Sequence, residues 1–242
     1  MMNFIRFVWI IFWMVLLTLL LFIPIVITGI FSRTGNLSFN IQRLWPLVFS
    51  RVSFVKIIVK GKEKIKKRES YVIVSNHQSH YDTIAIINAL PIQFRWVIKK
   101  ELLRIPLFGY ALYASKHIFV DRSNKELAIA SIQKGFKRLA PGVSVLFFAE
   151  GTRSPDGEIK EFKKGAFVAA INNAITILPV TVNGSRKILS KHNLWVKPGK
   201  IEVVVNDPIV TKDCTIDDLE KVMQKTRDSI VASFNPLYPE KS

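Results

Sequence analysis

The sequence predicts an α/β domain whose central, mostly parallel sheet is flanked by helices, preceded by an N-terminal helical membrane anchor. Short apolar runs rich in β-branched residues alternate with longer helical patterns, which is the order of strand–helix–strand units. Polar clusters follow several of these runs, as expected where parallel strands end at one edge of a sheet. A long apolar stretch near the start of the chain is sufficient to cross a bilayer as a helix.

The N-terminal stretch carries no charge between Arg6 and Arg33 and therefore predicts a membrane helix. Residues 39–55 mix apolar and basic side chains, a pattern typical of an interfacial amphipathic segment. Two arrangements fit, a helix that spans the bilayer or a re-entrant pair of helices that dips into one leaflet. Basic residues follow the apolar run, so both arrangements place the remaining chain at the cytoplasmic face of the cell membrane. We assign residues 1–55 to the anchor and residues 56–242 to the α/β domain.

The composition narrows the classes of partner. Among 242 residues, 35 Lys and Arg against 18 Asp and Glu give a formal charge of +17, which suits anionic lipid, phosphorylated substrates, acidic proteins or nucleic acid. No zinc-finger or RNP-like motif is present, so no nucleic-acid partner is expected. The single cysteine, Cys214, excludes an internal disulfide and a multi-cysteine zinc site. A membrane-anchored, non-enzymatic basic protein that binds anionic lipid or nucleic acid is one alternative.

Predicted strands and helices alternate after the anchor. A basic segment, residues 60–68, opens the domain as a solvated loop or strand edge. The predicted strands cover residues 71–74, 94–98, 117–120, 143–148, 175–182 and 201–205. The predicted helices cover residues 83–90, 102–114, 125–139, 162–173 and 216–234.

One polar turn joins the strand at residues 71–74 to the helix that follows it. Within this turn, His77 and Asp82 are separated by four residues, and a strand-to-helix turn can fold so that the carboxylate reaches one imidazole nitrogen. A histidine held in this way keeps its other nitrogen available to accept a proton from a hydroxyl. The residues alone therefore predict His77 as a general base and Asp82 as the group that orients it.

The same turn permits a different chemistry. His80 lies between His77 and Asp82, so the three side chains could form a metal-binding set of a metal-assisted hydrolase. No fourth ligand is signalled by the sequence, and this hypothesis leaves the other polar clusters without a role.

Four motifs in order resemble those of the glycerolipid acyltransferases. NHQSHYD resembles the family's N-H-x-x-x-x-D box, and FAEGTRS resembles its E-G-T-R-S box. KKELLRIPLFG with IFVDR resembles the substrate-binding box between them, and ILPVTVNG resembles the fourth, proline-centred box. The resemblance covers residues 72–184 and is strongest to the bacterial 1-acyl-sn-glycerol-3-phosphate acyltransferases. It implies transfer of a fatty acyl group from a thioester to the sn-2 hydroxyl of lysophosphatidic acid, which gives phosphatidic acid for phospholipid synthesis.

This reaction needs a base for the hydroxyl proton and hydrogen-bond donors for the oxyanion, but no metal and no bound cofactor. His77 supplies the base, and the substrate's own hydroxyl takes the place that a serine fills in a hydrolase triad. Main-chain N–H groups of the turn after His77 are expected to serve as oxyanion donors. Acceptors other than lysophosphatidic acid, such as another lysolipid or a polyol, are an alternative.

Cationic side chains must bind the glycerol phosphate. Arg153 is the first choice, because a guanidinium can bind phosphate with two hydrogen bonds. The resemblance adds Glu150, Gly151 and Thr152 to the same pocket, and Lys100 and Arg122 as further phosphate ligands.

The acyl donor is either acyl-acyl carrier protein or acyl-CoA, since the basic chain would attract both acidic molecules. The preference for acyl chain length is expected to depend on an apolar tunnel, lined by Leu102, Ile105, Leu107, Phe108 and Tyr110. The sequence indicates no oligomeric state.

Overall fold

The computed structural model describes residues 2–121, 123–191 and 193–239. Within these residues, seven strands form one sheet in the order β1-β7-β6-β2-β5-β3-β4. All neighbouring strands run parallel except β6 and β7, so the predicted mostly parallel sheet is confirmed. The strands are β1 (Val55–Lys60), β2 (Val72–Ser75), β3 (Phe94–Lys99), β4 (Ile118–Val120), β5 (Ser144–Phe148), β6 (Ile177–Asn183) and β7 (Gly199–Val205).

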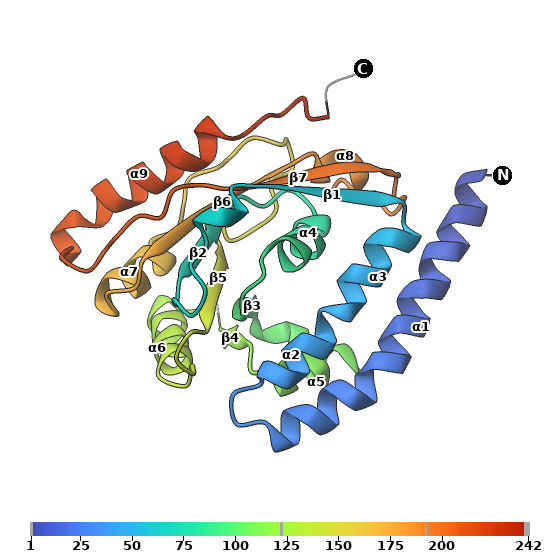
Figure 1. Cartoon of the computed structure of the whole chain (residues 1–242), viewed down its shortest axis with the longest axis horizontal. Helices are drawn as coiled ribbons and strands as arrows, with labels where there is room; N and C mark the ends of the chain where they lie inside the picture. Colours follow the sequence, from blue (N-terminus) through green and yellow to red (C-terminus); the bar gives the residue numbers. More distant parts are fainter. Residues whose placement is uncertain (1, 122, 192, 240–242) are drawn as a thin grey trace.

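Helices cover both faces of the sheet (Figure 1). One face carries α4 (Tyr81–Ala89), α8 (Ser185–Ile188) and the N-terminal helices, and the other carries α6, α7 and α9. The remaining helices are α1 (Met2–Phe31), α2 (Asn36–Gln42), α3 (Leu44–Val52), α5 (Phe108–Ala114), α6 (Lys125–Phe136), α7 (Gly165–Asn172) and α9 (Leu219–Ala232). Short 3₁₀ turns are η1 (Lys62–Lys64), η2 (Lys100–Arg104) and η3 (Ile216–Asp218).

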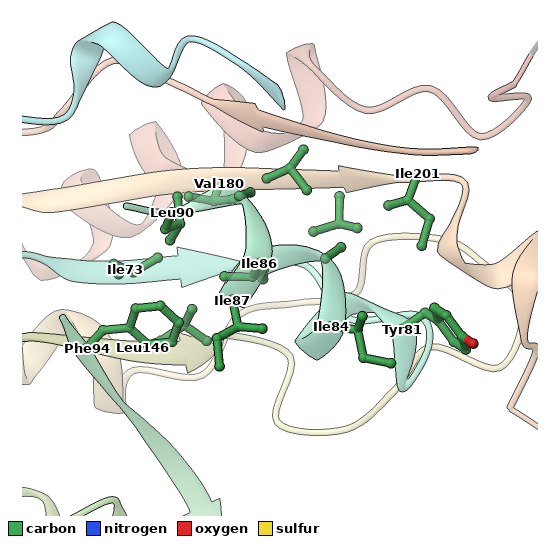
Figure 2. Close-up of a cluster of buried hydrophobic side chains, with 14 of the residues drawn as sticks. Ile73, Tyr81, Ile84, Ile86, Ile87, Leu90, Phe94, Leu146, Val180 and Ile201 are labelled. Atoms are coloured by element: carbon green, nitrogen blue, oxygen red, sulfur yellow. The ribbon is translucent and has the colours of Figure 1, made fainter. Parts of the chain in front are cut away.

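Each face of the sheet has its own apolar core. Ile73, Leu146 and Val180 point to the α4 side, where they pack with Ile86 and Leu90 (Figure 2). The alternate residues of the same strands point to the α6–α7 side. Burial on both faces explains why the strands read as continuous apolar runs in the sequence.

The N-terminal segment combines a long apolar helix with two short helices that pack on the domain. Residues Phe4–Phe31 of α1 are long and apolar enough to cross a membrane, which makes α1 a candidate anchor. Phe39 of α2 and Phe49 of α3 belong to the core on the α4 side. The fully buried Arg95 of β3 donates to Asn36 Oδ1 at 2.6 Å. The two short helices therefore complete the core, and a domain boundary at residue 55 stays a prediction.

The structure differs from the prediction at one helix and one strand. The predicted helix over residues 102–114 is two pieces, η2 and α5, separated at Pro106. Proline lacks the N–H that a continuing helix needs and disfavours helical backbone in the residue before it. Strand β1 was not predicted, because its apolar centre is short and its last residue belongs to the basic run assigned to a loop or strand edge.

Candidate active site

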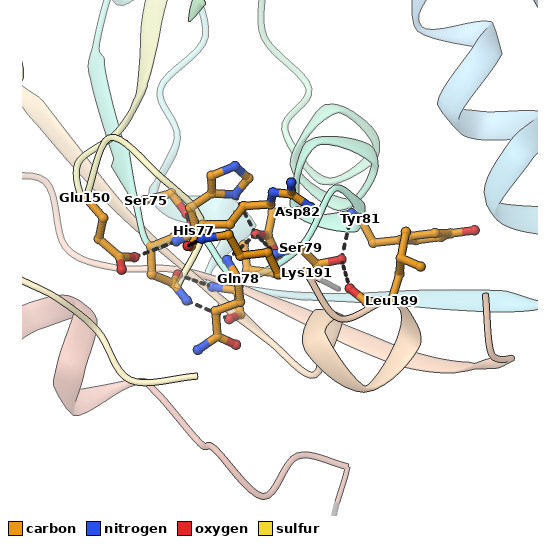
Figure 3. Close-up of polar contacts among 12 residues, drawn as sticks. Ser75, His77, Gln78, Ser79, Tyr81, Asp82, Glu150, Leu189 and Lys191 are labelled. Atoms are coloured by element: carbon orange, nitrogen blue, oxygen red, sulfur yellow. Dashed lines mark hydrogen bonds and ion pairs between the residues drawn. The ribbon is translucent and has the colours of Figure 1, made fainter. Parts of the chain in front are cut away.

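His77 lies in the turn between β2 and α4, at the carboxyl edge of the sheet (Figure 3). Its Nδ1 is 2.8 Å from Oδ2 of Asp82, a fully buried carboxylate, while the His77 side chain remains 15% exposed. Nδ1–H donates to this carboxylate, which leaves Nε2 as the proton acceptor. The predicted contact is present, and the catalytic role of the two residues stays a prediction.

Asp82 also organises the backbone of the turn. Its Oδ2 accepts the N–H groups of Gln78 at 2.6 Å and Ser79 at 2.8 Å. The Gln78 and Ser79 N–H groups are thus engaged with the carboxylate that orients His77. That main-chain N–H groups of this turn bind the oxyanion stays a prediction.

Aromatic rings hold the plane of the His77 imidazole. Phe148, the last residue of β5, stacks on His77 with ring centroids 3.7 Å apart and an angle of 9° between the planes. The Trp96 ring lies 5.6 Å from Phe148 on the same side of the sheet. The sequence placed Phe148 at a strand end but gave it no function, although its position two residues before Glu150 was a usable signal.

Glu150 joins the two principal motifs. Its Oε1 accepts the N–H of His77 at 2.7 Å, and its Oε2 accepts the N–H of Lys160 at 3.2 Å. Burial is the main cause that raises the Glu150 pKa above its ordinary value, against the lowering effect of these hydrogen bonds. The Ser154 N–H adds a bond of 2.8 Å to the His77 carbonyl. Glu150 thus docks its own turn on the His77 turn, and its predicted contact with substrate stays a prediction.

Asn76 is a residue that sequence reasoning missed. It is fully buried, donates from Nδ2 to the Val182 carbonyl at 2.9 Å and accepts the Val182 N–H at 2.8 Å. These two bonds fasten the end of β2 to β6, which carries the fourth motif. The asparagine directly before His77 therefore fixes the position of the backbone from which the His77 side chain extends.

The EGTRS turn carries the predicted phosphate ligand. Arg153 is half-buried there and lies close enough to His80 to act on it. Burial first, and then the charge of Arg153, lowers the pKa of His80 below its ordinary value. The Lys191 Nζ donates to the Arg153 carbonyl at 3.2 Å and adds a second cation that sequence reasoning missed. Both cations lie on the segments that surround the His77 turn.

The other residues of the predicted pocket differ in environment. Gly151 has a φ of +74°, a left-handed conformation that glycine adopts without strain. Thr152 is exposed. Lys100 is 63% exposed, and its Nζ lies 3.7 Å from Oδ2 of Asp121, which follows β4. Arg122 lies outside the described residues. Among the described residues, no hydrogen bond or ion pair joins Lys100 to the His77 turn.

The described part of the chain gathers no group of three or more His, Cys, Asp or Glu side chains suited to hold a metal ion. Three N–H groups occupy Asp82 Oδ2, the oxygen that faces His77. The geometry therefore favours an oriented histidine base over the metal set of His77, His80 and Asp82.

Comparison with known proteins assigns the chain to a protein family. The family model described as Acyltransferase matches residues 56–183, just over half of the chain. The chain belongs to the acyltransferase family. The resemblance seen in the sequence motifs is thereby confirmed.

Similar proteins of this family include the mouse 1-acyl-sn-glycerol-3-phosphate acyltransferase alpha, 30% identical over 82% of this chain and 70% of that protein. A Limnanthes alba protein named 1-acyl-sn-glycerol-3-phosphate acyltransferase is 34% identical over 76% of this chain and 66% of its own length. A putative enzyme of the same name from Caenorhabditis elegans is 33% identical over 74% of this chain and 64% of its own length. The chain thus spans about two thirds of the length of these curated relatives.

The fold is shared with a solved acyltransferase structure. The 1-acyl-sn-glycerophosphate (LPA) acyltransferase PlsC from Thermotoga maritima aligns with a TM-score of 0.80 and 22% identity. The alignment covers 99% of this chain and 98% of that chain, so it includes the N-terminal helices as well as the sheet.

Proposed function

We propose that the protein transfers a fatty acyl group from an acyl thioester to the sn-2 hydroxyl of 1-acyl-sn-glycerol-3-phosphate, forming phosphatidic acid. The observation that carries the proposal is His77, oriented by a buried carboxylate at 2.8 Å and joined through Glu150 to the turn that bears Arg153. The names of the relatives, 1-acyl-sn-glycerol-3-phosphate acyltransferases, support the acceptor class.

In this mechanism His77 Nε2 accepts the proton of the acceptor hydroxyl while the oxygen attacks the thioester carbonyl carbon. A tetrahedral intermediate forms, and its collapse breaks the carbon–sulfur bond. The imidazolium then returns the proton to the departing thiolate, which leaves as a free thiol. Asp82 stabilises the imidazolium and keeps the proton on Nδ1 before the reaction.

The acceptor phosphate is assigned to the cations beside this turn. Arg153 is the main ligand, because its guanidinium can form two charge-assisted hydrogen bonds. The Lys191 ammonium donates to the Arg153 carbonyl and adds a second positive charge beside it. Lys100 and Arg122 are assigned as further ligands from the more exposed substrate motif.

The protein is proposed to work at the cytoplasmic face of the cell membrane. The apolar side chains of α1 are largely exposed along the helix, as expected for an element in contact with lipid. The acceptor is a membrane lipid, whereas acyl-CoA and acyl-acyl carrier protein arrive from the cytosol.

The test is an assay of the full-length protein in detergent with lysophosphatidic acid and each donor, with and without EDTA. We expect phosphatidic acid as the product, at the same rate in both conditions, and little transfer to monoacylglycerol, which lacks the phosphate. If neither donor gives phosphatidic acid with lysophosphatidic acid, the proposal is contradicted. Activity that EDTA abolishes and zinc restores would support the metal-assisted hydrolase instead.

A further inference from the structure

The loop between α8 and β7, residues 189–198, presents two exposed apolar side chains at its tip. Leu194 is 77% exposed and Trp195 is 43% exposed. Hydrogen bonds hold the tip in a defined conformation. The Asn193 N–H donates to the Ser190 carbonyl at 3.2 Å, and the Asn193 Oδ1 accepts the Trp195 N–H at 2.8 Å. The loop therefore keeps a leucine and a tryptophan in solvent, which is typical of a site that meets a partner.

The tip lies against the first turns of α1. The Trp195 ring contacts the Phe7 ring, with centroids 5.1 Å apart. A cavity of about 230 Å³ lies between the loop and α1, so the two cover each other only in part. Helix α1 packs on α2, α3 and α5 and thus lies along the domain, while many of its apolar side chains are exposed. A lipid surface that contacts these side chains would also reach the loop tip.

Basic side chains surround the apolar tip. Lys197 of the loop and Lys200 of β7 are exposed, and Lys200 lies beside the exposed Lys56 in the neighbouring strand β1. Within the described part of the chain, none of these three lysines forms a salt bridge. A tryptophan among unpaired lysines suits the interface of an anionic phospholipid bilayer. A second copy of this chain would bring the same positive charge to the contact and fits less well.

The same loop contacts both turns of the candidate active site. The Ser79 hydroxyl of the His77 turn donates to the Leu189 carbonyl at 2.6 Å (Figure 3). The Lys191 Nζ donates to the Arg153 carbonyl of the EGTRS turn. Lys191 precedes Leu194 by three positions, which separates them by at most about 10 Å of extended chain. With the tip in the bilayer, the cations assigned to the acceptor phosphate would lie at the depth of the lipid headgroups.

We infer that Leu194 and Trp195 enter the interfacial layer of an anionic membrane beside the first turns of α1, and that this contact delivers the acceptor to the active site directly from the bilayer. The second part rests on the acyl transfer proposed above. Burial of one leucine side chain in apolar surroundings strengthens binding by roughly tenfold to a hundredfold. Loss of the insertion should therefore slow transfer to an acceptor embedded in a bilayer and leave transfer to a dissolved acceptor unchanged.

The first experiment measures the depth of the tip without turnover. In the full-length protein with Cys214→Ser, Leu194→Cys is labelled with a nitrobenzoxadiazole fluorophore, and the protein is bound to vesicles of phosphatidylcholine and phosphatidylglycerol. Val210→Cys is the matched control, since Val210 is 66% exposed and follows Ile209, which pairs with the first residue of β6 at the opposite edge of the sheet.

The label at position 194 should shift to the blue and be quenched by lipids that carry a spin label near the headgroup, and the label at position 210 should do neither. Absence of quenching at position 194 overturns the inference. A blue shift in detergent that grows with protein concentration, without quenching by labelled lipid, shows a contact between two copies and overturns it as well.

The second experiment measures the effect on transfer. Leu194→Glu places a negative charge at the tip, and Val210→Glu is its control. The kcat/KM is measured for a long-chain lysophosphatidic acid embedded in the same vesicles and for a short-chain one dissolved as a monomer. Leu194→Glu should lower the vesicle value by about tenfold or more and leave the monomer value unchanged, and Val210→Glu should change neither.

Equal losses of the Leu194→Glu variant with both acceptors, or no loss with either, overturn the delivery of the acceptor from the bilayer. The fluorescence result requires no transfer. A wild-type protein that transfers no acyl group would therefore remove the proposed function while leaving the position of the loop measured.

Discussion

The turn around His77 and the segment around Lys100 both follow parallel strands of the same sheet, yet their side chains differ in burial and in hydrogen bonding. In the first, Asp82 and Asn76 are fully buried and hydrogen-bonded on several sides. In the second, Lys99 and Lys100 extend into solvent, and the structure pairs them with the exposed Glu101 and with Asp121 after β4. Groups that move a proton must be oriented before substrate arrives, whereas exposed cations can settle on a phosphate when it binds. Changes in the first region should therefore lower kcat, and changes in the second should raise KM.

Asp82→Asn should give the largest loss. The amide cannot stabilise an imidazolium and supports the wrong tautomer of His77, so kcat should fall by roughly 10²–10⁴-fold with little change in KM. Steady-state kinetics with both substrates measure this. Asp121→Asn is the matched control from the second region, because that carboxylate is paired with Lys100. If the Asp82 variant keeps kcat within tenfold of the wild type, the described orientation of His77 is not used in catalysis.

Arg153→Ala should give the next effect. Removal of a charged hydrogen bond in a partly buried site should cost about 2–4 kcal/mol in kcat/KM for lysophosphatidic acid. The loss should appear as a higher KM for this acceptor and a nearly unchanged KM for the acyl donor. Arg138→Ala, at an exposed arginine after α6, is the control for lost surface charge. An unchanged acceptor KM would move the phosphate site to Lys100 and Arg122.

Lys100→Ala should have a smaller effect of the same kind. The side chain is 63% exposed, so its ionic contact with a phosphate is screened by water and contributes less than about 1 kcal/mol, or a fewfold in KM. Lys99→Ala, beside it and also exposed, should not change the acceptor KM. Equal effects of the two substitutions would indicate a general attraction by charge in place of a defined ligand.

A substitution away from both regions should affect stability more than turnover. Burial first, and then the charge of Arg95, lowers the pKa of His117 well below its ordinary value near 6.5. Neutral His117 accepts the Trp96 N–H at 3.1 Å, and its other nitrogen is 2.9 Å from Gln42 Oε1 of α2. The unfolded chain therefore binds a proton that the folded chain does not, so stability is present above pH 6.5 and is lost as the pH falls below it.

His117→Gln should weaken this dependence, because glutamine does not titrate. Thermal unfolding in detergent between pH 7.5 and pH 5 measures it, and the two proteins should differ in slope by up to about 1.4 kcal/mol per pH unit. Parallel curves for the two proteins would show that another group controls stability in this range.

The sequence predicted the parts of the site that depend on local geometry. The contact of His77 with Asp82 forms within a single turn, and the alternation of strands and helices predicted a mostly parallel sheet. Contacts between distant segments were not predictable from spacing. The clamp of Asn76 on Val182 joins residues 106 positions apart, and Glu150 reaches the His77 N–H across 73 positions.

The positions of apolar residues in the sequence were the least informative about the site. The five side chains expected to form a tunnel belong to η2, α5 and the residues between them, and Ile105, Phe108 and Tyr110 are exposed. The same apolar residue types occur on lipid-facing surfaces and in the walls of cavities, so the sequence could not distinguish the two environments.

The most direct test of the oriented base is a comparison of His77→Ala with His80→Ala, assayed side by side on the purified full-length protein with its metal content measured. His77 bonds to Asp82, whereas His80 is the N-cap residue directly before α4 and forms no hydrogen bond to that carboxylate among the described residues. The account predicts that His77→Ala lowers kcat by roughly 10²–10⁴-fold and that His80→Ala keeps most of the activity. A folded His80 variant as inactive as the His77 variant, with metal lost from both, would contradict it.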